Sequence, residues 1–181
     1  MKTIWLLLFC VITSQLPAQD SVKHRWQGGA ELDVLPYALG GYFAAGWIGK
    51  NQTRIRLLTA DVRKPDITTT KGFTKHRIHA YALVADYFFK PDWTGFWIGG
   101  GAVLWNSSIQ EKSSNKSASF SNYLLNGSAG YHYRFGKRYY LSPWAGLSLR
   151  VAGDKNILVG SSRYTLPLLN PEASLKLGMV F

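Results

Sequence analysis

Residues 173–181 read ASLKLGMVF, and their side chains alternate between two kinds. Ala173, Leu175, Leu177, Met179 and Phe181 are apolar, whereas three of the four positions between them hold serine, lysine and glycine. Successive side chains of a β-strand point to opposite faces, so this stretch predicts a strand with one apolar and one mainly polar face. Combined with a signal for export, it predicts a strand whose apolar face meets lipid.

The start of the chain has the features of such a signal. Met1 and Lys2 form a short basic start, residues 4–12 are a continuous apolar run, and Leu16-Pro17-Ala18 ends in a small residue before Gln19. The run has about half of the roughly 20 residues that a membrane-spanning helix needs. We therefore expect residues 1–18 to be a cleaved signal peptide and residues 19–181 to form a single outer-membrane β-barrel domain. Cys10 is the only cysteine, so the mature chain excludes disulfides, thiolate metal sites and cysteine nucleophiles.

The composition of the remaining chain fits one all-β domain. Aromatic residues make up 14% of the sequence and there are 18 glycines, which is typical of barrels whose flat aromatics lie at membrane interfaces. No later segment approaches 18 uninterrupted apolar residues, so no spanning helix is expected. The chain is basic, with 21 Lys and Arg against 10 Asp and Glu. Because export argues against nucleic acid, we expect anionic lipid and lipopolysaccharide phosphates as partners.

Alternation of apolar and polar residues divides the chain into eight candidate strands between turn signals. In the first, Glu31 and Asp33 lie opposite an apolar face, and in the third, Arg54 and Arg56 lie opposite Ile55 and Leu57. The fifth contains three consecutive glycines, and its facing is ambiguous. The eight segments are 26–35, 39–49, 54–62, 77–89, 96–105, 122–135, 141–151 and 166–181.

The connections between these segments alternate in length. Those around Asn51, Asp92 and Lys137 are short, whereas 63–75, 108–119 and 153–163 are long; only the first, around Pro36-Tyr37, breaks the pattern. An outer-membrane barrel with both termini in the periplasm predicts short periplasmic turns and long external loops. Aromatic residues are also more frequent at the ends assigned to the periplasm, where we expect an interfacial girdle of Trp26, Trp47, Tyr87, Phe88, Trp93, Phe96, Trp97, Tyr133, Phe135, Tyr139 and Phe181.

Residues 175–181, LKLGMVF, look like the sorting signal that the barrel assembly machinery of Gram-negative bacteria recognises. The apolar positions of this signal would be Leu175, Leu177, Met179 and Phe181. The whole mature chain resembles the small eight-stranded outer-membrane barrels of OmpA, OmpX and OmpW type. The resemblance implies an all-β fold, an eight-stranded antiparallel up-and-down transmembrane β-barrel, in the Gram-negative cell outer membrane. That class includes structural anchors, adhesins, narrow pores and a few lipid A modifying enzymes, so location is implied more firmly than activity.

The predicted inward positions are charged, and eight strands leave an interior just wide enough for side chains. Arg54 and Asp86 fall at similar heights on neighbouring strands, as do Arg150 and Glu172, so we expect two ion pairs because unpaired buried charge is costly. A plugged lumen is predicted, with a conducting or gated polar channel as the alternative. The expected lumen charge network comprises Glu31, Asp33, Arg54, Arg56, Asp86, Arg134, Arg150, Glu172 and Lys176.

A catalytic site can be assembled only loosely, from His132, Ser128 and Asp86, or from Ser148. No Gly-x-Ser-x-Gly elbow is present, and no histidine has a serine two residues later, as the outer-membrane lipid A deacylase class would need. His76 and His79 lie three apart, on opposite faces of a strand, and make a poor metal pair. We expect no enzymatic activity, no cofactor and no metal.

External loops are the remaining place for function. Residues 107–121 are rich in Ser, Asn and Lys, and 63–75 carry three lysines and an arginine beside Thr68-Thr69-Thr70. These cations favour contact with lipopolysaccharide phosphates, and adhesion to a host or partner is the sharper alternative. The leading hypothesis is a structural or surface-interaction barrel, and the second is a narrow channel for small or apolar solutes. A soluble barrel with a ligand inside would need the opposite placement of charged and apolar faces.

Overall fold

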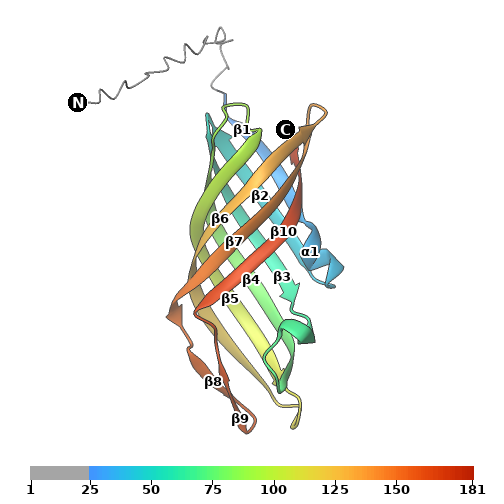
Figure 1. The fold of residues 1–181 in the computed structure, drawn as a ribbon, viewed down its shortest axis with the longest axis vertical. Coiled ribbons are helices and arrows are strands. Elements are labelled where there is room, and N and C mark those ends of the chain that lie inside the picture. Colours follow the sequence, from blue (N-terminus) through green and yellow to red (C-terminus); the bar gives the residue numbers. More distant parts are fainter. Residues whose placement is uncertain (1–24) are drawn as a thin grey trace, which may run out of the picture.

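The structure is a computed structural model that describes residues 25–181, so the expected signal peptide lies outside the described residues. Eight antiparallel strands close into one barrel in the order β1-β10-β7-β6-β5-β4-β3-β2 (Figure 1). Each strand pairs with its neighbours along the chain, and β1 pairs with β10, which confirms the predicted up-and-down fold. The barrel strands are β1 (Gln27–Asp33), β2 (Tyr42–Lys50), β3 (Thr53–Arg63), β4 (Phe73–Phe88), β5 (Gly95–Glu111), β6 (Ser117–Phe135), β7 (Tyr139–Gly153) and β10 (Leu169–Val180).

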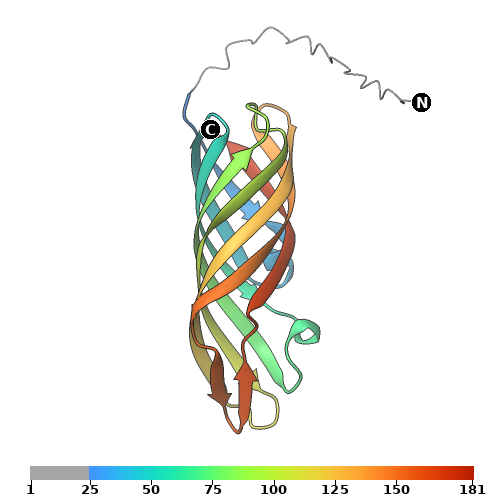
Figure 2. The same cartoon turned by 60° about the vertical axis from the view of Figure 1, so that its left-hand side comes forward.

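The two ends of the barrel differ in their connections. The end at which β1 begins and β10 finishes, here called the terminus end, has short turns, and Asn51 and Gly136 adopt positive φ in two of them (Figure 1). The opposite end, here called the hairpin end, carries the longer connections. They contain the short helix α1 (Val34–Ala38), the 3₁₀ turn η1 (Asp66–Thr68), and a separate two-stranded hairpin of β8 (Asn156–Val159) and β9 (Ser162–Thr165) (Figure 2). The predicted alternation of short and long connections holds except between β5 and β6, where the connection of residues 112–116 is shorter than the 89–94 turn at the terminus end.

Several boundaries differ from the sequence prediction; β4, for example, begins at Phe73 and β10 at Leu169. β1 ends at Asp33 because the Asp33 side chain accepts a hydrogen bond from Leu35 N (3.3 Å) and caps α1. The expected loop 108–119 is mostly strand, since β5 and β6 remain paired out to Gln110 opposite Ser117. The expected loop 153–163 contains β8 and the start of β9.

Apolar side chains face outward around the whole barrel. Leu57 is 68% exposed, and every barrel strand contributes at least one such residue. We call the following set the apolar belt: Leu32, Ile48, Leu57, Leu83, Ile98, Leu125, Leu147 and Leu177. The sequence left the facing of the fifth strand ambiguous. In β5, Phe96 and Ile98 point outward and Trp97 points inward. Among residues 25–181, no helix is long and apolar enough to cross a membrane.

Candidate functional site: the barrel interior

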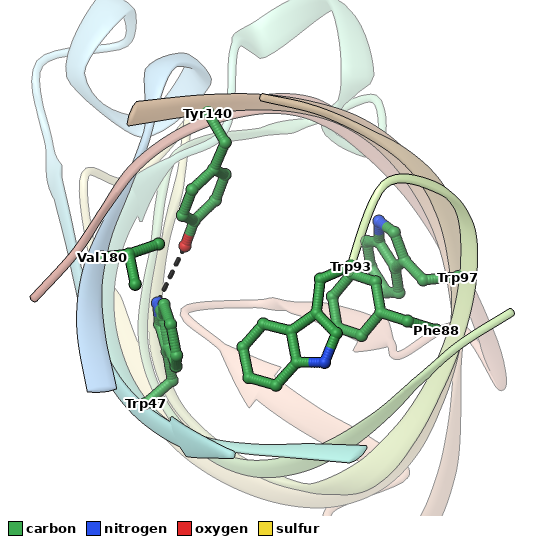
Figure 3. Packing of buried hydrophobic residues seen from close by; sticks show 6 residues of the cluster. All are labelled: Trp47, Phe88, Trp93, Trp97, Tyr140 and Val180. Atoms are coloured by element: carbon green, nitrogen blue, oxygen red, sulfur yellow. Dashed lines mark hydrogen bonds between the residues drawn. The ribbon is translucent and has the colours of Figure 1, made fainter. Parts of the chain in front are cut away.

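Aromatic rings pack against one another inside the barrel at the terminus end. Trp47 Nε1 donates a hydrogen bond to the Tyr140 hydroxyl (2.8 Å), and Phe88 stacks on Trp93 with ring centroids 5.2 Å apart (Figure 3). On the next strand, Trp97 is fully buried and its Nε1 donates to Ser142 Oγ (3.0 Å). We call this cluster the aromatic plug: Trp47, Phe88, Trp93, Trp97, Tyr140 and Val180.

The plug corrects part of the predicted girdle. Trp47, Phe88, Trp93 and Trp97 were expected at the membrane interface, but their side chains point into the barrel (Figure 3). The alternation of side chains along a strand explains why the plug residues on strands point inward. Phe88, for example, lies two residues from the inward-facing Asp86 and therefore points to the same face of β4. Those that do face outward at this end include Tyr87, Phe96, Tyr133, Phe135 and Tyr139.

Glycines on neighbouring strands make room for the plug. A Cβ atom on Gly178 would lie 2.0 Å from Cζ of Tyr140, and one on Gly29 would lie 2.3 Å from a ring carbon of Trp47. Non-bonded carbon atoms in optimal contact lie about 3.5–4.0 Å apart. A side chain at either position would therefore displace a ring. The same relation holds for Gly130 beneath Trp97 and Gly49 beneath Trp93.

Directly beside the plug, two arginines and two carboxylates form a closed group. Arg54 Nε lies 2.9 Å from Asp86 Oδ2, and Arg56 binds both carboxylate oxygens of Asp86 through Nε (2.7 Å) and Nη2 (2.8 Å). Glu31 contacts Nη1 of Arg54 (3.2 Å) and of Arg56 (3.4 Å). All four side chains are buried. The expected Arg54–Asp86 pair is therefore present, within a larger network.

Two further charged groups complete this level of the lumen. Lys176 Nζ lies 4.2 Å from the ring centroid of Trp144 and 5.0 Å from that of Trp97, a cation–π arrangement. Asp33 accepts hydrogen bonds from Trp144 Nε1 (2.8 Å) and from the Ser174 hydroxyl. Three carboxylates thus face three cations, and we call this set the charge network: Glu31, Asp33, Arg54, Arg56, Asp86 and Lys176.

Plug and network also contact each other. Cζ of Arg54 lies 5.1 Å from the ring centroid of Phe88 and 5.4 Å from that of Trp47, and its Nη1 donates to the Tyr140 hydroxyl (3.3 Å). A buried charge is tolerated when it is paired and hydrogen-bonded. The plug and the charge network therefore form one packed unit inside the barrel at the terminus end.

Three predicted members of the network lie elsewhere. Arg134 is at the rim of the terminus end, where it donates to the backbone carbonyls of Asp92 and Lys137 (3.3 Å each). The expected Arg150–Glu172 pair is wrong. Glu172 lies opposite Gly146 in the β10–β7 register and accepts a hydrogen bond from Ser148 Oγ (2.5 Å).

Arg150 lies nearer the hairpin end than the first residue of β10, because its N–H pairs with Leu168 O (2.9 Å). Its guanidinium donates to the carbonyl oxygens of Asp154 (2.8 Å) and Leu166 (3.3 Å). The strand register, which counting along the sequence misjudged, separates it from Glu172.

A second apolar cluster lies at the hairpin end, and sequence reasoning missed it. Residues of the β8–β9 hairpin pack against inward residues of β4, β5 and β6, with the Phe73 and Tyr164 rings 5.1 Å apart, edge to face. The sequence signal was present, since Val159 and Ser162 flank a two-residue turn that begins with glycine. We call this cluster the cap: Phe73, Ile109, Phe120, Val159, Tyr164 and Leu166.

A buried carboxylate holds the turn of this hairpin. Glu111 accepts hydrogen bonds from Ser161 N (3.3 Å), Ser161 Oγ (3.2 Å) and the Ser114 hydroxyl. Hydrogen bonds from Ser114 first, then from Ser162 and Ser161, lower the pKa of Glu111 to about 2. A Cβ on Gly160 would lie 2.0 Å from Glu111 Oε2, so the turn needs glycine both for this contact and for its φ of 63°.

The candidate catalytic residues are engaged in packing. The His132 ring stacks on Tyr140 (centroids 4.1 Å apart) and meets Phe88 edge to face, while Ser148 bonds Glu172 and Asn126. Within the part of the chain that the structure describes, no group of three or more His, Cys, Asp or Glu side chains could hold a metal ion.

The predicted assembly-signal residues lie at the terminus end of the barrel. Leu175 and Leu177 face outward on β10, and Phe181 N donates to Gly28 O (2.9 Å) while 76% of the residue is exposed. Met179 lies opposite Ala30 of β1 and Tyr139 of β7.

Comparison with known proteins supports the fold alone. No protein-family model and no curated protein matches the chain. Among solved structures, the chain is similar to the N-terminal β-barrel domain of Pseudomonas aeruginosa OprF, with a TM-score of 0.54 at 15% sequence identity. The match covers 86% of this chain and 96% of that domain, so the chain shares the fold of that barrel along nearly all of the described structure.

Proposed function

We propose that the protein is an integral outer-membrane barrel with a plugged lumen and a structural or surface-interaction role. One observation carries the proposal: the outer face is apolar around the whole ring, while the charge network is enclosed. Each side chain of the size of leucine gains roughly 1.5–3 kcal/mol on leaving water for apolar surroundings. A barrel in water would have the reverse arrangement, so the belt favours lipid as its surroundings.

The ends of the barrel suggest its orientation. At the hairpin end, the outward positions on β4 beyond the belt are Lys75, Arg77 and His79, and Arg77 pairs with Asp61 (2.7 Å). This end carries nine Lys and Arg residues within 61–77, 106–121 and 153–166, against four Asp and Glu. We place it at the outer surface, where its cations meet lipopolysaccharide phosphates.

Biogenesis follows from the same proposal. The chain is exported by its signal peptide in a Gram-negative cell, and the barrel assembly machinery recognises Leu175, Leu177, Met179 and Phe181. These residues extend along the outer face and rim of β10, the strand whose pairing with β1 closes the barrel. Before closure, a peptide-binding partner would find the edge of β10 that faces β1 unpaired, since its other edge pairs with β7.

We also propose that the lumen neither conducts nor catalyses. The aromatic plug, the charge network and the cap are all buried inside the barrel, and a further buried cluster of Phe43, Ala45, Ala60 and Ala80 lies between the network and the cap. Planar-bilayer recording tests this, with heat-modifiable gel migration of the same preparation as the measure of folding. The proposal predicts folded, inserted protein without conductance steps. Stable steps from folded protein would favour the channel alternative.

The lipopolysaccharide contact has its own test. Lys75→Gln combined with Arg77→Gln should reduce lipopolysaccharide co-purifying with the barrel several-fold, because each surface cation near anionic lipid contributes about 1 kcal/mol. Lys137→Gln with Arg138→Gln, at the terminus end, is the matched control and should leave the amount unchanged. Equal losses in both double variants would argue against the assigned orientation.

A further inference from the structure

A small cavity lies inside the hairpin end, beneath the cap. Its volume is about 20 Å³, which is enough for a water molecule or a monatomic ion. Three basic side chains line it, Lys64 from the segment after β3, His76 from β4 and Arg150 from β7. Ser107 and Asn122 add polar groups, and no carboxylate is among the lining residues.

Buried groups without a partner gather at this cavity. Eight buried side-chain nitrogen or oxygen atoms of the described residues have no hydrogen-bond partner, and four of them belong to residues that line it. They are both ring nitrogens of His76, Ser107 Oγ and Arg150 Nε, and His76 and Ser107 are 6% and 5% exposed. Leaving such a group unsatisfied costs about 1–3 kcal/mol, so four together favour an occupant.

The charges at this level are unbalanced. Among the described residues, neither Lys64 nor Arg150 has a carboxylate within 4.0 Å, and the guanidinium of Arg150 bonds only backbone carbonyls. The one carboxylate that acts on Lys64 is Glu172, which is bonded to Ser148. The charge network nearer the terminus end, by contrast, matches three cations with three carboxylates.

We infer that this cavity is a binding site for one small monovalent inorganic anion of the size of chloride. Arg150 Nε–H, the Ser107 hydroxyl and one N–H of His76 donate to the anion, and Lys64 supplies further positive charge. A water molecule would satisfy the donors and leave the excess charge, whereas a metal cation would find no anionic ligand. The site lies within the folded barrel, so it goes beyond the proposed membrane role and does not depend on it.

Crystals of the unmodified protein grown in sodium bromide locate the anion directly. The inference predicts an anomalous bromide peak in the cavity, in contact with Arg150 Nε and His76. Peaks confined to surface lysines and arginines, which would indicate an adventitious ion only, would overturn it. The result is independent of lipid, so it can fail while the membrane proposal stands.

Urea unfolding in detergent tests the same site in solution. The wild-type chain should unfold at a higher urea concentration in sodium chloride than in sodium gluconate at equal ionic strength, because gluconate is too large for the cavity. Arg150→Gln should abolish this difference, and Arg77→Gln, which removes an outward cation, should retain it. Equal midpoints in both salts for the wild type, or an unchanged difference in Arg150→Gln, would contradict the inference.

Discussion

Arg54 and Asp86 lie directly opposite each other on β3 and β4, with Nε and Oδ2 2.9 Å apart and both side chains almost fully buried. Their neighbours in sequence, Ile55 and Tyr87, face outward. The same two strands therefore carry the enclosed charges and the apolar outer surface, one on each face. This inversion relative to a water-soluble barrel is the basis of the proposed function.

Asp86 is the carboxylate shared by both arginines, so its removal should be the most damaging single change in the network. Asp86→Ala leaves Arg54 and Arg56 facing only Glu31, and breaking a buried pair costs about 3–5 kcal/mol. Urea unfolding of the refolded protein in detergent measures the loss. Asp92→Asn, at an exposed turn, is the control and should cost less than about 1 kcal/mol. A loss of that small size for Asp86→Ala would show that the network contributes little.

Gly178 tests the fit of the aromatic plug. An added methyl group in Gly178→Ala must displace the ring of Tyr140 and with it the hydrogen bond to Trp47, at a cost of about 1–3 kcal/mol. Gly46→Ala is the matched control, because nothing lies within 4 Å of its added Cβ. Unfolding free energies that fall equally in the two variants would contradict the described packing.

Because His76 is buried, we expect the stability of the protein to depend on pH. It lies beyond the apolar belt, where burial first and the charge of Lys64 second lower its pKa to about 4. Around it stand Lys64 and Arg150, the rings of Phe120 and Tyr164, and Ser107.

Because the folded pKa is below the unfolded value of about 6.5, the unfolded chain binds the proton more tightly. Neutral His76 therefore contributes to the unfolding free energy above about pH 6.5. This contribution, about 3 kcal/mol, is lost as the pH falls to about 4. His76→Gln should remove this component, measured as the difference in unfolding free energy between pH 7 and pH 4 in gluconate. A variant with the pH profile of the wild type would rule this assignment out.

Glu111 should hold the β8–β9 hairpin in place. Glu111→Ala removes the acceptor for Ser161 and Ser114, so the hairpin should detach from the cap, and the backbone at Lys155 and Arg163, whose side chains are already exposed, should become free to enter the trypsin active site. We expect cleavage at these residues at least about tenfold faster than in the wild type, since two or more hydrogen bonds of about 1 kcal/mol each are lost. Asp66→Asn, another carboxylate at this end, is the control. Cleavage at the wild-type rate in Glu111→Ala would refute the role of this carboxylate.

The fold followed from the sequence because a barrel alternates strictly between two faces. Parity alone placed Glu31, Asp33, Arg54, Arg56 and Asp86 in the lumen. Counting residues from the terminus end of the strands also paired Arg54 with Asp86, which lie opposite each other in the β3–β4 register.

Contacts farther from the terminus end were not predicted from the sequence. Counting along the strands paired Arg150 with Glu172, but the β7–β10 register places Glu172 opposite Gly146, four residues before Arg150. Serine-rich strands such as the end of β5 resemble solvated loops in composition, so their pairing and the cap above them were not anticipated. The sequence placed the aromatic residues of the plug at the correct end of the barrel but on its outer face. The same residue types, Trp, Tyr and Phe, occur both at membrane interfaces and inside the barrel, so residue type alone does not distinguish the two faces.

Spin-label accessibility in lipid vesicles tests the central claim, that the outer face lies in lipid. Nitroxides are placed on cysteines at Leu83, Leu125 and Leu147 in the belt, and at Lys75 beyond it. If the belt lies in lipid, the belt labels should collide with dissolved oxygen far more often than with a water-soluble nickel complex, and the label at Lys75 should show the reverse. Belt labels that collide freely with the nickel complex in folded, vesicle-bound protein would contradict it.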